Sequence, residues 1–191
     1  MLVAVYGGSF DPPHVAHVIT ASYVLAVGGF DRLIVVPVYE HPFGKPLAPF
    51  DERLAMCRLA FAGLSAVEVS DIEASLGKPS YTERTLEALR ERTPGASYRF
   101  VMGSDALAET GAWHAFDRVA ELAPPFVVAR VGHHRPGLGP AVLPDVSSTR
   151  VRELLARRGD PGAARELGWL VPASILAYIE ERGLYRESPD G

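Results

Sequence analysis

Cysteine is almost missing from this sequence, and that scarcity excludes two kinds of site. Cys57 is the only cysteine among the 191 residues, so no intramolecular disulfide can form and a cysteine-based zinc site would lack its partners. Cys57 lies in an apolar run with helical spacing, which predicts a buried small hydrophobic side chain rather than a reactive thiol. His133, His134 and Arg135 are neighbours in the chain and adjacent residues seldom ligate one ion well, so we expect no protein metal site.

An excess of positive charge is also missing. The formal net charge is −4, whereas binding to nucleic acid or to an anionic membrane needs a broad basic surface. We therefore expect neither partner, although a few local cations suffice for the phosphates of a nucleotide substrate. No segment reaches the ~18 unbroken apolar residues of a membrane helix, and no basic stretch precedes the first apolar run. We expect a cytoplasmic protein, and the pattern leaves the oligomeric state open.

What is present is an alternation of strand-like and helix-like segments. The expected strands are residues 2–6, 32–37, 67–70, 98–102, 126–129 and 141–144. The expected helices are residues 15–27, 51–62, 80–92 and 115–122, with two more that begin near Thr149 and Pro172. This alternation predicts an α/β fold with a doubly wound, Rossmann-like parallel sheet and right-handed crossovers. We expect a single domain over residues 1–191, with residues 149–187 as a small C-terminal helical portion.

Several local patterns predict how particular segments begin or pack. Asp51 can cap the second helix, and residues 80–83 have the form of a capping box. Asp145 or one of the hydroxyl residues after it can cap the helix that begins near Thr149. Residues 131–140 are rich in Gly, Pro and His, which predicts an exposed loop. Trp169, which stands between leucines, is expected to pack in the core.

Ligands of doubly wound sheets bind at the carboxyl ends of the strands, where the strand order reverses. Four unusual clusters follow predicted strands, namely residues 7–17, 38–45, 103–105 and 147–152. We therefore expect these four segments to meet at one edge of the sheet and to form the functional site.

The first cluster has the features of a phosphate-binding loop. Gly7 and Gly8 let the backbone turn sharply and approach a ligand closely. The loop amides, the Ser9 hydroxyl and the N-terminus of the next helix all favour an anion. His14 and His17 are three residues apart, so both rings lie on one helix face and can donate hydrogen bonds to a phosphate. The alternative is an ordinary glycine turn followed by structural histidines.

The last cluster resembles an N-capped helix start that could also hold an anion. Arg152 lies one turn into this helix, on the face that begins at Ser148, and an arginine can bind two phosphate oxygens at once. A plain capped helix with a solvated face is the alternative. Other nucleotide loops are missing, because the chain has no G-x-G-x-x-G after a strand and no G-x-x-x-x-G-K-[ST].

Taken together, these segments resemble a known family. Residues 7–17 resemble the G-G-[ST]-F-D-P-x-H-x-G-H signature of the nucleotidylyltransferase superfamily, although Ala16 stands where that family usually has glycine. Residues 146–152 resemble its I-S-x-T-x-x-R signature. Residues 170–185 are similar to the L-V-P-x-x-V-x-x-Y-I-x-x-x-x-L-Y ending of nicotinate/nicotinamide mononucleotide adenylyltransferases. The resemblance covers essentially the whole chain.

The resemblance implies an ATP site in which three residues, His14, His17 and Arg152, are catalytic. The expected ATP-binding residues are Gly7, Gly8, Ser9, Phe10, His14, His17, Gly103, Asp105, Ser147, Ser148, Thr149 and Arg152. Asp105 resembles the acid of the family's G-x-D, which lies near the ATP ribose, and a plain helix cap is the alternative for it. Mg²⁺ is expected to be carried with ATP.

The resemblance also implies a site for the second substrate. The expected mononucleotide-binding residues are Ser9, Lys45, Tyr81, Thr82, Thr85 and Trp113. Thr82 and Thr85 share a helix face and could hydrogen-bond the pyridine carboxylate or carboxamide, while Trp113 could stack on the ring. Lys45 is either a phosphate contact or a solvated lysine of a mobile loop, and Arg53 could likewise be a surface residue.

The implied activity is transfer of AMP from ATP to nicotinate mononucleotide, which yields the dinucleotide and pyrophosphate in NAD biosynthesis. Three alternatives remain open at this point. They are another adenylyltransferase of the superfamily, such as one acting on phosphopantetheine, a nucleotide-binding regulator without catalysis, and a dinucleotide-dependent oxidoreductase. The preference for nicotinate over nicotinamide mononucleotide is also open.

Overall fold

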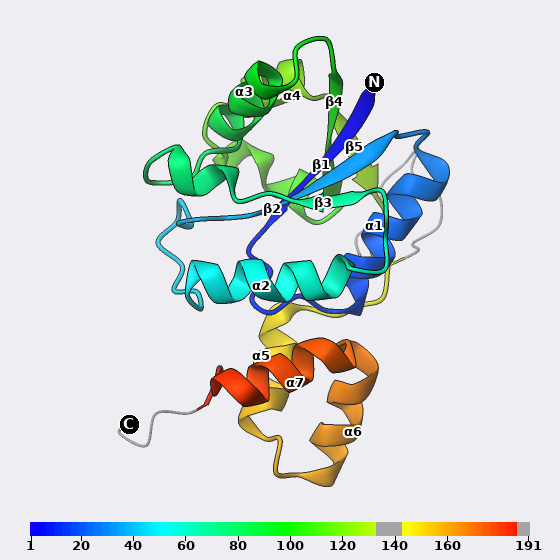
Figure 1. Ribbon diagram of the computed structural model, residues 1–191, viewed down its shortest axis with the longest axis vertical. Coiled ribbons are helices and arrows are strands. Elements are labelled where there is room, and N and C mark those ends of the chain that lie inside the picture. Colours follow the sequence, from blue (N-terminus) through cyan, green and yellow to red (C-terminus); the bar gives the residue numbers. More distant parts are fainter. Residues whose placement is uncertain (133–142, 187–191) are drawn as a thin grey trace.

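The computed structural model describes residues 1–132 and 143–186, and its centre is a five-stranded parallel sheet (Figure 1). The strands are β1 (Leu2–Gly8), β2 (Arg32–Pro37), β3 (Val67–Val69), β4 (Ser97–Gly103) and β5 (Pro125–Val128). Their order is β3-β2-β1-β4-β5, and every neighbouring pair is parallel. The order reverses between β1 and β4, so the predicted doubly wound, Rossmann-like fold is confirmed.

Helices cover both faces of the sheet and form a further group beyond it (Figure 1). They are α1 (Val15–Val27), α2 (Phe50–Phe61), α3 (Thr82–Arg92), α4 (Phe116–Leu122), α5 (Ser148–Ala156), α6 (Pro161–Leu170) and α7 (Ala173–Arg182). Two 3₁₀ helices are η1 (Ile72–Ser75) and η2 (Ala106–Ala112). No helix in the described part of the chain is long and apolar enough to cross a membrane.

The two faces of the sheet carry separate apolar cores because side chains alternate along each strand. Val3 and Val5 of β1 pack with residues of α3, α4 and η1. Ala4, on the opposite face, packs with residues of α1 and α2. All three are at most 1% exposed. The strands are therefore buried on both faces, which is typical of parallel sheets, and ligands can approach only at the strand ends.

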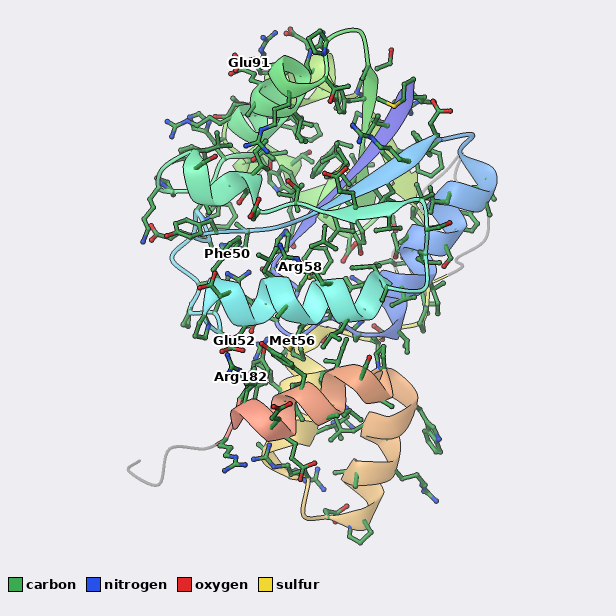
Figure 2. The ribbon with its side chains drawn as sticks, viewed as in Figure 1. Phe50, Glu52, Met56, Arg58, Glu91 and Arg182 are labelled. Carbon is green, nitrogen blue, oxygen red and sulfur yellow. The ribbon has the colours of Figure 1, made fainter. Side chains whose placement is uncertain are left out.

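The C-terminal helices α5, α6 and α7 have a core of their own, and α2 contributes to it. Met56 of α2 is fully buried among Val151, Leu155 and Ile175 of that group. Glu52 of α2 accepts hydrogen bonds from Tyr178 Oη at 2.7 Å and from the Arg182 guanidinium. Figure 2 shows Glu52 and Met56 on the side of α2 that faces α7. Helix α2 therefore joins the sheet to the C-terminal group.

Most predicted elements are confirmed, with shifted starts for two helices. Helix α2 begins at Phe50 after Pro49, so the predicted cap at Asp51 is wrong. The N-cap of α3 is Tyr81 and no side chain caps it, so the capping box at residues 80–83 is also wrong. Ser147 caps α5, and its hydroxyl accepts a hydrogen bond from the Arg150 amide at 3.2 Å, as predicted for a residue of this segment.

Two predicted segments fall partly outside the described residues. Of the expected strand at residues 141–144, Leu143 forms an isolated parallel bridge with Arg130, while residues 141–142 lie outside the description. Val131 and Gly132 are exposed, and the rest of the expected loop at residues 131–140, which includes His133, His134 and Arg135, is not described either. Helix α6 was not predicted from the sequence.

Truncating Met56 should weaken the packing between α2 and the C-terminal helices. Met56→Ala is expected to lower the free energy of unfolding by about 2–5 kcal/mol, because it removes a fully buried side chain between two layers. Urea unfolding followed by circular dichroism measures the change. Arg58→Ala is the control, since Arg58 is an exposed residue of the same helix (Figure 2) and should change stability by no more than ~0.5 kcal/mol. Equal effects of the two substitutions would contradict this account.

Candidate nucleotide-binding site

The loop between β1 and α1 is built around the buried ring of Phe10. Phe10 is 1% exposed and adopts a left-handed backbone with φ of 47°. Its ring makes edge-on contacts with Tyr6 and Phe61 at centroid distances of 5.4 and 6.2 Å. A Cβ at Gly8 would lie 3.2 Å from that ring, so glycine lets the strand end pass directly over it. Packing thus fixes a turn that presents the amides of residues 8–10 at the carboxyl end of β1.

The two predicted histidines meet at the start of α1. The rings of His14 and His17 lie 3.8 Å apart between centroids, with an interplanar angle of 31°. The His14 backbone amide donates a hydrogen bond to Nδ1 of His17 at 3.1 Å. Because Nδ1 of the neutral His17 ring acts as the acceptor, its proton lies on Nε2, which is therefore a hydrogen-bond donor. Nδ1 of His14 is buried and has no hydrogen-bond partner within the described residues.

Both imidazoles are held in the neutral form. Burial, and to a smaller extent the nearby Arg130 guanidinium, lowers the pKa of His14 to about 4. Burial, the His14 ring and Arg130 all lower the pKa of His17 well below its ordinary value. Two stacked imidazolium ions would repel one another at this distance, so the neutral pair is what the geometry permits. A negative charge beside the rings would shift this balance, because it favours the protonated form.

The start of α5 contacts the same loop, as the sequence predicted for the first and last clusters. The Ser148 hydroxyl donates to the Pro12 carbonyl at 2.9 Å. Arg152 Nη1 donates to the Asp11 carbonyl at 2.6 Å, and its Nη2 donates to the Thr149 hydroxyl at 3.2 Å. These contacts join segments that are about 140 residues apart in the chain. They bring His14, His17 and the amides of two helix starts to one place.

Arg130 is a residue of this site that the sequence analysis missed. It follows β5, and its Nη1 donates to Oδ2 of Asp105 at 2.6 Å, while its Nη2 donates to the Val146 carbonyl at 2.9 Å. Asp105 therefore pairs with an arginine and does not cap η2 through its side chain. Arg130 links the end of β4 to the segment before α5 and adds positive charge close to both histidines. Its position directly after a predicted strand end was the available signal.

Arg53 is buried, so the interpretation of it as a surface residue is wrong. The whole residue is 1% exposed. Its guanidinium donates to backbone carbonyls of Ala48 at 2.8 Å, Ser9 at 2.9 Å and Tyr39 at 3.5 Å. Arg53 therefore fastens the loop after β1 to the loop after β2. Lys45, in that second loop, is exposed. Burial lowers the pKa of His41 most, and the positive charge of Lys45 lowers it as well.

Of the residues predicted for the second substrate, Ser9 and Lys45 lie in the loops after β1 and β2, whereas the other four lie at the start of α3 or between η2 and α4. The Tyr81 ring stacks on the His114 ring with centroids 4.2 Å apart, and His114 Nδ1 lies 2.9 Å from Oε1 of the buried Glu83. Trp113 packs edge-on against Phe100 at 5.9 Å. These contacts hold α3 against the chain between η2 and α4.

The two threonines of this segment differ in their surroundings. Thr85 is buried, and its hydroxyl donates to Oε1 of Glu73 at 2.8 Å, while Glu73 Oε2 accepts from the Tyr39 amide at 2.9 Å. Thr82 is half-buried at the first position of α3. The structure thus gives the Thr85 hydroxyl a protein partner and leaves Thr82 nearer the surface. A small pocket beside Thr85 is lined by Glu73 of η1, by Tyr81 and by residues of the segment between η1 and α3.

Two further expectations concern single side chains. Cys57 is fully buried, as predicted, and burial raises the pKa of its thiol. Trp169 is 65% exposed, so its predicted place in the core is wrong; the Arg165 guanidinium lies over its ring at 5.4 Å. In the described residues no three His, Cys, Asp or Glu side chains gather in a way that could hold a metal ion.

Comparison with known proteins agrees with this geometry. The family model described as cytidylyltransferase-like matches residues 5–154. A protein of Anaeromyxobacter sp. (strain K) is 46% identical, and the alignment covers 96% of each chain. A protein of Myxococcus xanthus (strain DK1622) is 42% identical over 96% of this chain and 94% of its own. Both relatives carry the name "Probable nicotinate-nucleotide adenylyltransferase".

A solved structure gives the same fold. The Plasmodium falciparum nicotinic acid mononucleotide adenylyltransferase complexed with NaAD superposes with a TM-score of 0.80 at 19% identity, over 96% of this chain and 97% of the other. The doubly wound sheet and the family model place the chain in the cytidylyltransferase-like class of nucleotidyltransferases. Within that class, the identity to its relatives is decisive: the chain belongs to the nicotinate-nucleotide adenylyltransferase family.

Replacing Arg130 should make both histidines easier to protonate. In the wild-type protein, titration of the ring protons by NMR should give a midpoint of about pH 4 for His14. Arg130→Gln is expected to raise the midpoints of His14 and His17, because it removes a positive charge and leaves Asp105 unpaired. Arg99→Gln is the control. The Arg99 guanidinium likewise makes two hydrogen bonds next to β5, to the carbonyls of Pro124 and Pro125, but Arg99 is not among the charges that lower the pKa of either histidine. Unchanged midpoints in Arg130→Gln would contradict the assignment.

The same depressed pKa values fix the direction of a stability change with pH. Between about pH 6.5 and pH 4 the unfolded chain binds more protons at His14 than the folded chain does. The free energy of unfolding should therefore fall as the pH drops through this window. A smaller fall in Arg130→Gln than in the wild type would agree with the NMR result.

Proposed function

We propose that this chain transfers AMP from ATP to nicotinate mononucleotide, giving nicotinate adenine dinucleotide and pyrophosphate, as a step of NAD biosynthesis. The observation that carries the proposal is the contact between the two helix starts. Ser148 and Arg152 of α5 bind the carbonyls of Pro12 and Asp11, directly before His14. These contacts support a site at the switch point of the sheet in which loop amides, two neutral imidazoles and a guanidinium would act together.

The proposed site would act on the triphosphate of ATP. Amides of the first loop, Nε2 of His17, His14 and Arg152 would contact the phosphates. The Arg152 guanidinium has five N–H groups, and its contacts with Asp11 and Thr149 use two of them. The remaining donors are compatible with a bound pyrophosphate group. Ser147, at the N-cap of α5, and Thr149 in its first turn place their backbone amides at the same helix start.

The reaction itself needs no covalent enzyme intermediate. A 5′-phosphate oxygen of the mononucleotide attacks the α-phosphorus of ATP in line, the bond to the β-phosphate oxygen breaks, and pyrophosphate leaves with the negative charge. Mg²⁺ would arrive with ATP and would neutralise part of the phosphate charge. The protein contributes positioning and charge neutralisation. An approaching phosphate would raise the pKa of both histidines, so each could carry a positive charge when the leaving group forms.

The adenosine and the pyridine would lie on opposite sides of this centre. Gly103 ends β4, and Asp105 follows it at hydrogen-bond distance from Arg130, so we propose Asp105 as a ribose contact that Arg130 orients. Tyr81, Thr82 and Trp113 support a pyridine site at the start of α3. Thr85 supports that site from behind through Glu73, and Lys45 would contact phosphate only if its loop folds over the site.

A coupled pyrophosphate assay tests the activity and the choice of pyridine. Purified protein with ATP, Mg²⁺ and nicotinate mononucleotide should release pyrophosphate, and the dinucleotide should appear in equal amount by chromatography. We expect a higher kcat/KM for the acid than for nicotinamide mononucleotide, as the name of the relatives implies. Absence of the dinucleotide with either mononucleotide would overturn the proposed function.

Removing one preorganised donor should slow turnover without unfolding the protein. His17→Ala is expected to lower kcat by about 10²–10³-fold, because such losses are typical when one donor to developing charge is deleted. Circular dichroism and a melting curve check the fold. Arg150→Ala is the matched control, since Arg150 lies at the same helix start but pairs with Glu166 of α6. Near-normal turnover of His17→Ala would contradict the assigned role.

A further inference from the structure

A hydrogen bond ties the end of the described chain to the phosphate loop. The Tyr185 hydroxyl donates to Oδ1 of Asp11 at 2.7 Å, across 174 positions of sequence. Asp11 is 2% exposed, so its carboxylate must be satisfied by protein groups. The Ala48 amide donates to the same oxygen at 3.2 Å, and Arg152 Nη1 lies 3.6 Å from Oδ2. Tyr185 supplies the shortest of these contacts.

The backbone before Tyr185 is shaped to make this contact. Helix α7 ends at Gly183, which is left-handed with φ of 63°, and the Leu184 amide donates to the Ile179 carbonyl at 3.0 Å. Tyr185 then adopts φ of 55°, a conformation that is uncommon for an aromatic residue and costs about 1–3 kcal/mol. The left-handed conformations of Gly183 and Tyr185 together turn the chain back toward Asp11. Such strain persists only where surrounding contacts determine it.

The Tyr185 hydroxyl keeps its proton and so remains a hydrogen-bond donor to Asp11. Burial and the Asp11 carboxylate both raise the pKa of Tyr185. The phenol therefore keeps its proton over the whole range in which the protein works, and the contact with Asp11 does not switch with pH. Asp11 in turn precedes Pro12, whose carbonyl accepts from Ser148, and its own carbonyl accepts from Arg152.

We propose that Tyr185 is a positioning residue for adenylyl transfer, because its bond to Asp11 sets the conformation of the phosphate loop. This inference rests on the proposed function. It assigns a role to the last residue of the family-like ending at residues 170–185, which lies outside the two signatures of the phosphate site. Tyr185 touches neither substrate in this scheme. It fixes the carboxylate that lies between Ser9 and His14, and so holds the loop amides and the first imidazole in their reactive arrangement.

The chain itself offers a matched comparison. The Tyr178 hydroxyl donates to Oε2 of Glu52, also at 2.7 Å. Both tyrosines therefore join the C-terminal helices to the sheet through a carboxylate. The two carboxylates lie in different parts of the fold. Glu52 lies in α2, whereas Asp11 lies in the loop between β1 and α1. If both hydrogen bonds serve stability alone, neither substitution should change turnover. If the Tyr185 bond positions the loop, turnover should fall only when Tyr185 is replaced.

The experiment compares Tyr185→Phe with Tyr178→Phe in the full chain. Both should melt at lower temperature than the wild type, Tyr185→Phe by the larger amount, because Asp11 is buried whereas Glu52 is partly exposed and keeps Arg182 as a partner. In the pyrophosphate assay at 25 °C, Tyr185→Phe should lower kcat about tenfold, with the KM for nicotinate mononucleotide changed less than twofold. Tyr178→Phe should keep the wild-type kcat. Amide hydrogen exchange of residues 9–14 should accelerate in Tyr185→Phe alone.

The outcomes separate the two proposals. A wild-type protein that forms no dinucleotide overturns the proposed function, and the exchange comparison then still tests whether Tyr185 orders the loop. An active wild type with equal kcat in both variants, or equal exchange at residues 9–14, overturns the inference about Tyr185. If Tyr185→Phe does not fold, Asp11→Asn weakens the same bond from the loop side and should show the same fall in kcat. Wild-type kcat in folded Asp11→Asn overturns the inference as well.

Discussion

The buried guanidinium of Arg53 is the constraint on which the arrangement of the site depends. A charged side chain that is 1% exposed is stable only when its donors are satisfied, and Arg53 uses carbonyls from three segments. Those carbonyls belong to Ser9, Tyr39 and Ala48, which lie after β1, after β2 and before α2. The guanidinium requires all three backbones to converge. The phosphate loop is therefore shaped by its contacts with the protein before any ligand binds.

The basic side chains around that loop are either paired or neutral. Arg53, Arg130 and Arg152 are held by carbonyls or by carboxylates, while His14 and His17 stay neutral. In the proposed function, the positive charge that a triphosphate needs would thus be partly present and partly supplied when the histidines take up protons. Charge supplied in this way has an advantage, because stacked imidazoles that were already protonated would strain the folded state. Binding of phosphate and protonation of the histidines then favour each other.

The sequence predicted the elements well where a pattern is local, and poorly where a contact is distant. Residues 15–27 and 32–37 match α1 and β2 in full, since Gly28 and Gly29 separate two apolar runs, one on each side of them. The burial of Arg53 could not be foreseen, because its partner Ser9 lies 44 positions away. Arg130 was missed for the same reason, as Asp105 is 25 positions away. Helix α6 did have a local signal, an Asp160 cap followed by proline at its first position.

The two sequence signatures form one structural unit, which explains why they are informative as a pair. Taken alone, residues 7–17 allow a glycine turn and residues 147–152 allow a capped helix. In the fold, Ser148 and Arg152 bind the carbonyls of Pro12 and Asp11, so neither segment keeps its conformation independently of the other. The C-terminal helices also pack against α2 through Met56, which holds α5 beside this loop. The helices α5–α7 lie beyond the sheet, and they nevertheless hold the loop at residues 7–17 in its conformation.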